Sequence, residues 1–121
     1  MSPSQPADQP RRLSVEHRMV DGVRVVALRG EIDHDVQEQF SQALLGEGDA
    51  GSVRVVADFR GVTFMDSSGI NVLVATRRQV SQAGGWLRIA GAQESVLRVL
   101  QMTGVDSLID CLPTIEQALT A

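Results

Sequence analysis

The segment Asp66-Ser67-Ser68-Gly69 holds the residues whose types and spacing are best suited to chemistry. It follows an apolar run and comes directly before a pattern of apolar residues typical of an amphipathic helix. Aspartate and serine side chains at a helix start accept hydrogen bonds from free amide groups of the first turn, so the local pattern alone favours helix capping. The same position leaves a hydroxyl open to another protein. A phosphate added there would bring about −1.5 to −2 charges beside the positive end of the helix.

Catalysis by Ser67 is not supported by the residues around it. The nucleophile elbow of a serine hydrolase has glycines two positions on either side of the serine, but here Met65 and Gly69 occupy them. Both histidines, His17 and His34, precede the serine, whereas a hydrolase more usually places its base late in the chain. The sequence has no lysine, which removes both a lysine-containing phosphate loop and Schiff-base chemistry. The residues around Ser67 therefore predict no catalytic residue of a serine hydrolase, and no phosphate loop.

Metal and thiol chemistry are disfavoured as well. Asp33-His34-Asp35 groups three candidate ligands, but no second histidine or cysteine cluster completes a site. Helix capping already explains why an aspartate stands at this helix start. Cys111 lies in an apolar, strand-like run, so we expect a small core residue and not a nucleophile. We expect neither a metal nor a cofactor.

Composition narrows the class of protein further. The chain has 121 residues, of which 43% are hydrophobic and 21% charged, as is usual for one globular domain. Its net charge of −4 lacks the basic surface that direct binding of nucleic acid requires. Without a secretory signal or an apolar run of about 20 residues, we expect a cytoplasmic protein that does not enter a membrane. No long apolar stripe is evident, so we expect a monomer when the protein is free.

Hydrophobic periodicity predicts the elements that position these groups. Residues 1–12 hold three of the four prolines and no apolar pattern, which predicts a flexible N-terminal tail. Alternating residues over 13–17 and a β-branched, apolar run over 23–28, joined by Asp21-Gly22, predict a β-hairpin. Further strands are expected at 52–59, 86–90 and 108–112. Helices are expected from Asp33 to the glycines 46 and 48, from the Asp66 segment to Ala83, over 94–102, and from Pro113 as first helical residue to Leu119.

This order of elements, β-β-α-β-α-β-α-β-α, predicts an α/β fold. Repeated β-α alternation after a leading hairpin favours a mostly parallel mixed sheet with an antiparallel leading strand, about four helices and right-handed crossovers. The order of the strands within the sheet does not follow from the pattern.

Three motifs carry a resemblance to a known family. The run from Val62 to Ile70, VTFMDSSGI, closely resembles the phosphorylation-site motif of bacterial anti-sigma factor antagonists, which are single STAS domains. Gly30-Glu31-Ile32-Asp33 is similar to the family's turn after the second strand, and Met102-Thr103-Gly104-Val105 to the end of its third helix. The resemblance covers residues 13–120, and it implies a STAS-type fold over that range.

The resemblance also implies a function, and that function is not enzymatic. In this family the unphosphorylated antagonist binds an anti-sigma factor with serine kinase activity, a GHKL-type ATPase, and thereby releases a sigma factor. The kinase phosphorylates the first serine after the motif aspartate, which is Ser67 here, and a PP2C-type phosphatase reverses the step.

The same resemblance implies which residues contact the partner. Asp66 should cap the helix and shape the loop, while Glu31 and Asp33 should help to form the docking surface. The remaining expected partner-binding residues are Ser68, Gly69 and Asn71. Many family members have glycine at the position of Asn71, so the approach of the partner and the choice of partner can differ here.

Two other functions stay open at this point. A STAS domain can serve as the regulatory subunit of a membrane transporter, although that class need not keep a phosphorylatable serine such as Ser67. A small nucleotide-binding enzyme is the second alternative, and the missing phosphate loop disfavours it.

Overall fold

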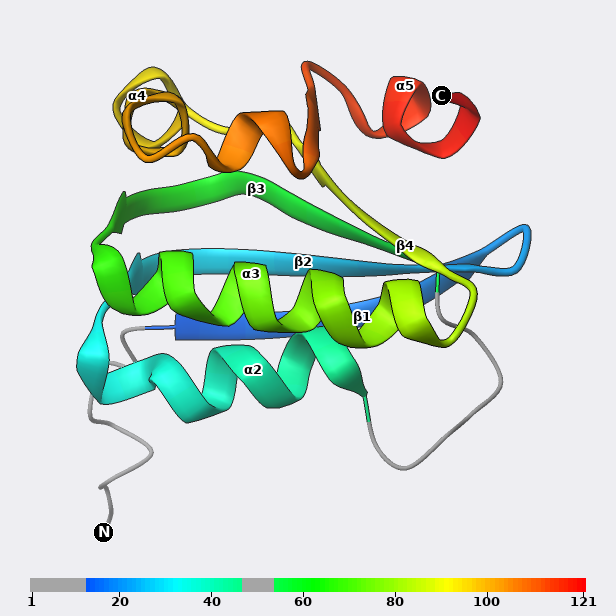
Figure 1. The fold of residues 1–121 in the computed structure, drawn as a ribbon, viewed down its shortest axis with the longest axis horizontal. Helices are drawn as coiled ribbons and strands as arrows, with labels where there is room; N and C mark the ends of the chain where they lie inside the picture. Colours follow the sequence, from blue (N-terminus) through cyan, green and yellow to red (C-terminus); the bar gives the residue numbers. More distant parts are fainter. Residues whose placement is uncertain (1–12, 47–53) are drawn as a thin grey trace, which may run out of the picture.

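The computed structural model of the chain describes residues 13–46 and 54–121. Figure 1 shows strands flanked by helices, with α2 and α3 side by side and both beginning at the same end of the sheet. The strands are β1 (Leu13–Val20), β2 (Val23–Ile32), β3 (Arg54–Met65), β4 (Trp86–Ala90) and β5 (Asp110–Leu112). The helices are α2 (Gln37–Leu45), α3 (Ser67–Gln82), α4 (Glu94–Met102) and α5 (Ile115–Thr120), with short 3-10 helices η2 (His34–Val36) and η3 (Val105–Ser107).

The sheet has the order β1-β2-β3-β4-β5, so each strand pairs with its neighbour in the sequence. β1 is antiparallel to β2 and the remaining pairs are parallel, which confirms the predicted mixed α/β sheet. Asp21 and Gly22 make the predicted hairpin turn with φ of 51° and 81°. Positive φ at both central residues is the requirement of a type I′ turn.

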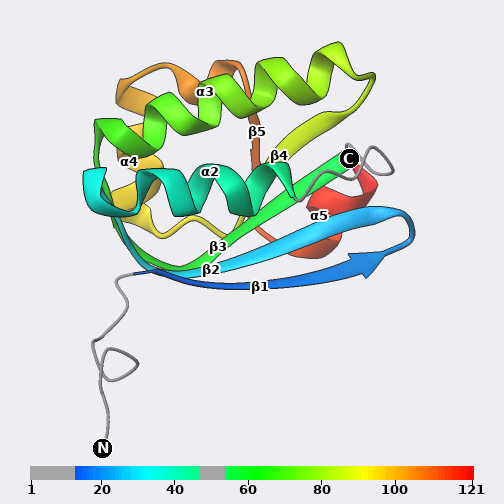
Figure 2. The same cartoon turned by 90° about the horizontal axis from the view of Figure 1, so that it is seen from below.

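Helices cover the two faces of the sheet unequally. α2 and α3 lie together along one side, where Phe40, Leu44 and Leu73 join the larger hydrophobic core (Figure 2). On the opposite face, Ile115 and Ala118 of α5 pack in a smaller cluster with β2, β3 and β4. Strand alternation explains the division, since successive side chains of a strand point to opposite faces.

β3 is longer than its sequence pattern predicts. The apolar run suggested an end at residue 59, but the strand continues to Met65 beside β2, which itself reaches Ile32. The register between the two strands shifts at two places, between Ala27 and Arg29 and between Gly30 and Glu31. Such irregularities let a strand bend and continue pairing, and no hydrophobic periodicity reveals them.

Two C-terminal boundaries also differ from the prediction. β5 begins at Asp110, because Ile109 still donates a hydrogen bond from its backbone to the Val105 carbonyl at 2.9 Å. Pro113 is not the first helical residue, since Thr114 is the N-cap of α5 and its hydroxyl accepts from the Gln117 amide at 3.1 Å. The expected tail over residues 1–12, the start of the strand expected at 52 and the stop at residue 48 lie outside the described residues.

Candidate functional site

The candidate site forms where the parallel strands β2 and β3 end together. Ile32 is paired with Met65 at the last position of the ladder, so the chain leaves both strands at one edge of the sheet. The backbone of Asp66 donates a hydrogen bond to the Ile32 carbonyl at 3.2 Å. Topology thus brings the two sequence motifs together, one after each strand.

Asp66 caps α3 as its sequence pattern predicts. Its backbone is extended, and its Oδ1 accepts a hydrogen bond from the Ser68 amide at 2.8 Å. The Asp66 carbonyl accepts from the amides of Gly69 and Ile70, at 3.1 and 3.3 Å. These bonds satisfy amides of the first turn that no preceding helical residue can reach.

Ser67 is the first residue of α3 and its side chain is exposed. Within the described ranges, no hydrogen bond engages its hydroxyl, whereas the adjacent Ser68 is half-buried. A free hydroxyl at a helix N-terminus suits an added anion, because the helix dipole favours negative charge there.

Gly69, two residues after Ser67, is buried. A methyl group on its Cα would lie 2.5 Å from the Cγ of Met65 and 2.9 Å from the Cγ2 of Ile32. The absence of a side chain therefore lets α3 start directly against the ends of both strands. The packing role of Gly69 is one that a sequence pattern does not reveal. The contact with the partner that the motif suggested for Gly69 stays a prediction.

The turn after β2 supplies acidic groups beside α3. Glu31 is exposed and is paired with Phe64 of β3. Asp33 caps η2 by accepting a hydrogen bond from the Asp35 amide at 3.0 Å. The expected cap at Asp33 is thus present, but on this short 3-10 helix, since the N-cap of α2 is Val36, which makes no side-chain bond. The predicted residues Glu31, Asp33 and Asp66 are thus brought to one end of the sheet.

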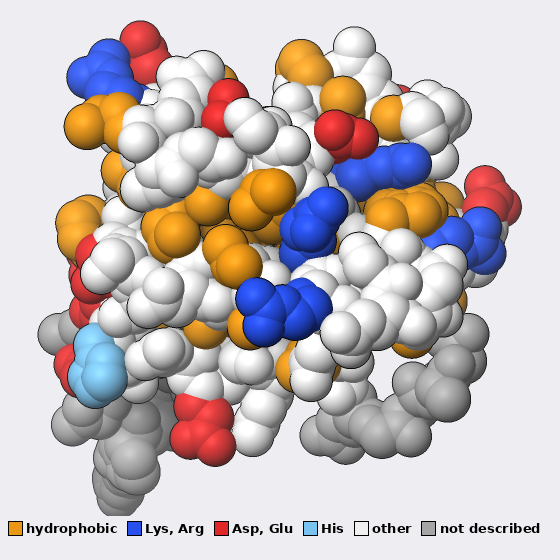
Figure 3. Space-filling view, viewed as in Figure 1, with side chains coloured by type: hydrophobic (Ala, Val, Ile, Leu, Met, Phe, Trp, Pro, Cys, Tyr) orange, Lys and Arg blue, Asp and Glu red, His pale blue; other side chains and the backbone are white. Residues whose placement is uncertain are grey.

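A groove of about 640 Å³ separates the start of α2 from α3. Asn71 lines it from α3, opposite His34, Asp35 and Glu38. Seen from the side of α2 and α3, acidic side chains lie near the start of α2 and arginines gather farther along α3 (Figure 3). Sequence reasoning included Asn71 but missed Asp35 and Glu38 as surface residues of this site; the exposed face of the amphipathic helix was the available signal.

The other candidates for chemistry were a single thiol and the possible metal ligands. Cys111 is half-buried, and burial, with smaller contributions from Asp106 and Asp110, raises the pKa of its thiol to about 11. The thiol is therefore protonated at neutral pH and weakly nucleophilic. Over residues 13–46 and 54–121, no cluster of three or more histidine, cysteine, aspartate or glutamate side chains is placed to hold a metal ion.

Comparison with known proteins agrees with this geometry. The sequence matches the STAS domain family over residues 14–118. The chain belongs to the STAS domain family. This STAS domain is 28% identical over 113 residues to an anti-sigma F factor antagonist of Paenibacillus polymyxa. The aligned region covers 90% of this chain and 92% of that protein. The resemblance to STAS-domain anti-sigma factor antagonists that the motifs indicated is confirmed.

Solved STAS domains share the fold. An anti-sigma factor antagonist from Mycobacterium paratuberculosis superposes with a TM-score of 0.80 at 27% identity, covering 97% of this chain and 96% of that one. The anti-sigma factor antagonist SpoIIAA in its unphosphorylated form gives a TM-score of 0.70 at 26% identity, covering 88% and 93% of the two chains. Among the described residues, no helix has both the length and the apolar character needed to cross a membrane.

Proposed function

We propose that this STAS domain is a cytoplasmic anti-sigma factor antagonist that is not an enzyme and is controlled by phosphorylation of Ser67. The observation that carries the proposal is an exposed serine hydroxyl at the capped start of α3, next to an acidic turn. The names of the relatives support the role, and one solved relative is described in an unphosphorylated form.

The partner in this proposal is an anti-sigma factor of the GHKL type with serine kinase activity. In this proposal Glu31, Asp33, Gly69 and Asn71 contribute to the contact with it. Asn71 lines the groove between α2 and α3, and the bond from the Ser68 amide to Asp66 holds the loop in shape. The surrounding carboxylates, Asp35 and Glu38 included, suit a basic partner surface, because opposite charges steer association and suppress wrong partners. Binding of the unphosphorylated form occupies the anti-sigma factor and releases the sigma factor.

Phosphorylation switches this contact off. The Ser67 Oγ attacks the γ-phosphorus of ATP, the bond from that phosphorus to ADP breaks, and the hydroxyl proton leaves to a base of the kinase or to solvent. The helix N-terminus tolerates the phosphate, but a partner surface matched to the bare serine then meets added bulk and extra charge. A PP2C-type phosphatase restores the hydroxyl with water and releases inorganic phosphate.

Phosphopeptide mapping and calorimetric titration test the proposal. After incubation with the kinase and Mg-ATP, we expect phosphate on Ser67, none in Ser67→Ala, and unchanged modification in the matched control Ser68→Ala. Phosphorylation should weaken partner binding at least about a hundredfold, or about 2.8 kcal/mol. Ser67→Asp should weaken it less, because one carboxylate carries less charge than a phosphate, and Ser67→Ala should bind without being switched off.

Two outcomes would contradict the proposal. Phosphate on Ser68 would overturn the assignment of the acceptor. Equal affinities of the bare and phosphorylated forms would overturn the switch.

A further inference from the structure

Among the described strands, β1 forms an edge of the sheet. It stands at one end of the strand order, and among the described strands it pairs with β2 alone. Its pairing runs without a register shift from Leu13 opposite Gly30 to Val20 opposite Val23. The eight residues, LSVEHRMV, include no proline and no glycine. Natural edges are blunted by short length, proline, bulges or charged side chains. Of these devices β1 has only charged side chains, Glu16 and Arg18, so its main chain can pair with a strand whose charges match theirs.

The hairpin turn determines which main-chain groups of β1 face outward. A two-residue turn makes its flanking residues, Val20 and Val23, a hydrogen-bonded pair, and the pairs alternate from there along an antiparallel ladder. Val15, His17 and Met19 therefore direct their amides and carbonyls away from β2. Among the described residues, no hydrogen bond from outside β2 reaches the main chain of these three.

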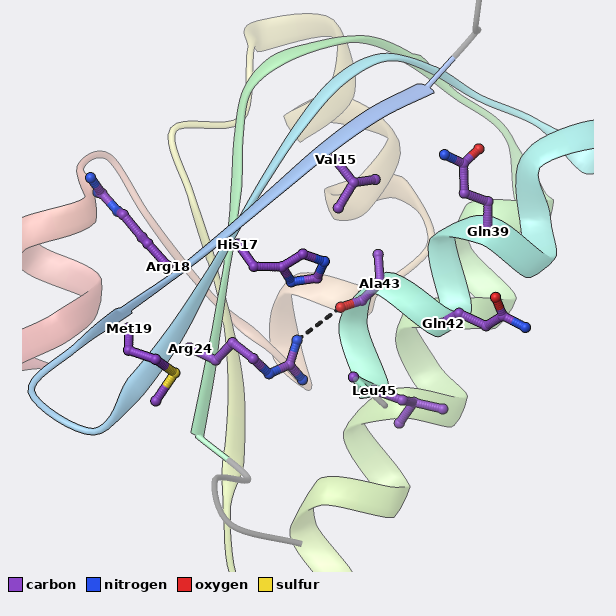
Figure 4. A pocket seen from close by; sticks show the side chains of 10 residues that line it. Val15, His17, Arg18, Met19, Arg24, Gln39, Gln42, Ala43 and Leu45 are labelled. Atoms are coloured by element: carbon purple, nitrogen blue, oxygen red, sulfur yellow. Dashed lines mark hydrogen bonds between the residues drawn. The ribbon is translucent and has the colours of Figure 1, made fainter. Parts of the chain in front are cut away.

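The side chains of the same three residues line a groove of about 620 Å³ between β1 and α2. Figure 4 shows Val15 and His17 directed toward α2, with the Arg24 guanidinium bonded to the Ala43 carbonyl in the background. Met19 also lines the groove, although 58% of it is exposed to solvent. A strand added beside β1 would cover this side chain, because residues directly opposite each other point to the same face.

The other face of β1 carries a pair of unmatched charges. Glu16 and Arg18 are both exposed, and within the described residues neither has an ion-pair partner. Their neighbours on β2 are Ala27 and Val25, which carry no charge. The edge strand therefore offers one acidic and one basic side chain on the same face.

We propose that two copies of the chain associate by antiparallel pairing of β1 with β1, about a two-fold axis at His17. In this register Val15 lies opposite Met19 of the second copy, and Glu16 lies opposite Arg18 of the second copy. Symmetry repeats both contacts. The outward main-chain groups of Val15, His17 and Met19 meet their equivalents and complete the hydrogen-bond ladder.

Charge selects this register among those that the ladder allows. A shift by one residue would set outward-facing main-chain groups against inward-facing ones. A shift by two residues places Glu16 opposite Glu16 in one direction and Arg18 opposite Arg18 in the other. Like charges directly opposite each other destabilise a strand pair, whereas opposite charges stabilise it.

The association is weak, because the pairing of one strand from each copy gives a contact smaller than a stable interface. We expect a monomer at about 10 μM and a growing dimer fraction toward about 1 mM. The monomer expected from the sequence is thus the state at low concentration, and the proposed dimer forms at high concentration. The proposal is independent of Ser67 and of the proposed antagonist role.

Sedimentation velocity of the full chain over that concentration range tests the proposal through a charge swap. Glu16→Arg and Arg18→Glu should each weaken dimerisation at least about tenfold, because each puts like charges opposite each other twice. The double variant Glu16→Arg/Arg18→Glu should restore the wild-type affinity. An equimolar mixture of the two single variants should form a heterodimer, although neither associates alone.

Unchanged melting temperatures of the single variants serve as the control for folding. A wild-type chain that stays monomeric at about 1 mM overturns the proposal. Single variants that dimerise as well as the wild type overturn it too, since another surface would then be responsible. A double variant and a mixture that both remain monomeric overturn the register.

Discussion

Gly69 lies in the first turn of α3, between the side chains of Met65 and Ile32. Its position joins the two parts of the site, because α3 can start against the strand ends only where no Cβ intervenes. The motif identified Gly69 but did not show why a glycine is required there. The requirement comes from the packing of a helix start on two strands, which depends on contacts between distant parts of the chain. Asp66 and Asp33, by contrast, could be predicted as caps, because capping depends on residues two or three positions away.

We expect Gly69→Ala to lower the free energy of unfolding by up to about 2 kcal/mol. Overpacking costs about 1–3 kcal/mol, and alanine returns about 1 kcal/mol as the better helix former. Urea denaturation measures the change. Met65→Ala removes the closest atoms, so the double variant should lose less stability than the two single variants together. A Gly69→Ala protein as stable as the wild type would contradict the packing role.

At the scale of elements, the C-terminal end of α2 is held by a group from elsewhere in the fold. Arg24 of β2 donates to the carbonyls of Ala43 and Leu44, whereas the Asp33 cap belongs to η2, which precedes α2. Gly46 then leaves the helix with φ of 77°. The sequence predicted the glycine stop, because glycine readily adopts positive φ. It did not predict Arg24, because a cation from a neighbouring strand leaves no local pattern.

Arg24→Met should destabilise the protein by about 1.5 kcal/mol, the lower range for hydrogen bonds from a charged donor. The variant also removes a positive charge from the negative end of the helix dipole, which lowers the stability further. Amide exchange should accelerate in the last turn of α2, where two carbonyls lose their donor. Arg78→Met, which changes an exposed arginine of α3, is the matched control and should stay within about 0.5 kcal/mol. Equal stability of both variants would argue against the capping role of Arg24.

At the scale of the whole molecule, the order of helices and strands along the chain was predictable. Which of these elements lie next to each other in space was not. Alternating residues in 13–17 and amphipathic spacing in 94–102 each report on a single element, whereas the strand order depends on which elements meet. The extension of β3 to Met65 has the same cause, since residues 60–65 become a strand through pairing with β2. Long-range pairing thus determines the site, because it places Asp66 beside Ile32.

Phosphorylation of Ser67 should leave this framework unchanged. The phosphate would lie at an exposed helix start whose dipole favours an anion, so no buried contact has to break. In amide NMR spectra we expect shifts confined to the first turn of α3 and the turn at Asp33. Widespread shifts in β3 and β4 would instead indicate a rearrangement and would contradict a switch based on local charge.

The strictly sequential strand order has a consequence for folding during synthesis. Each strand pairs with the strand that was synthesised just before it. A parallel pair can therefore form as soon as the connecting helical segment and the second strand have been made. Contacts between neighbours in sequence cost less loop entropy than contacts between distant segments. The nascent chain can therefore add strands one at a time as it leaves the ribosome. The last helix, α5, then covers the second face only after the other elements are in place.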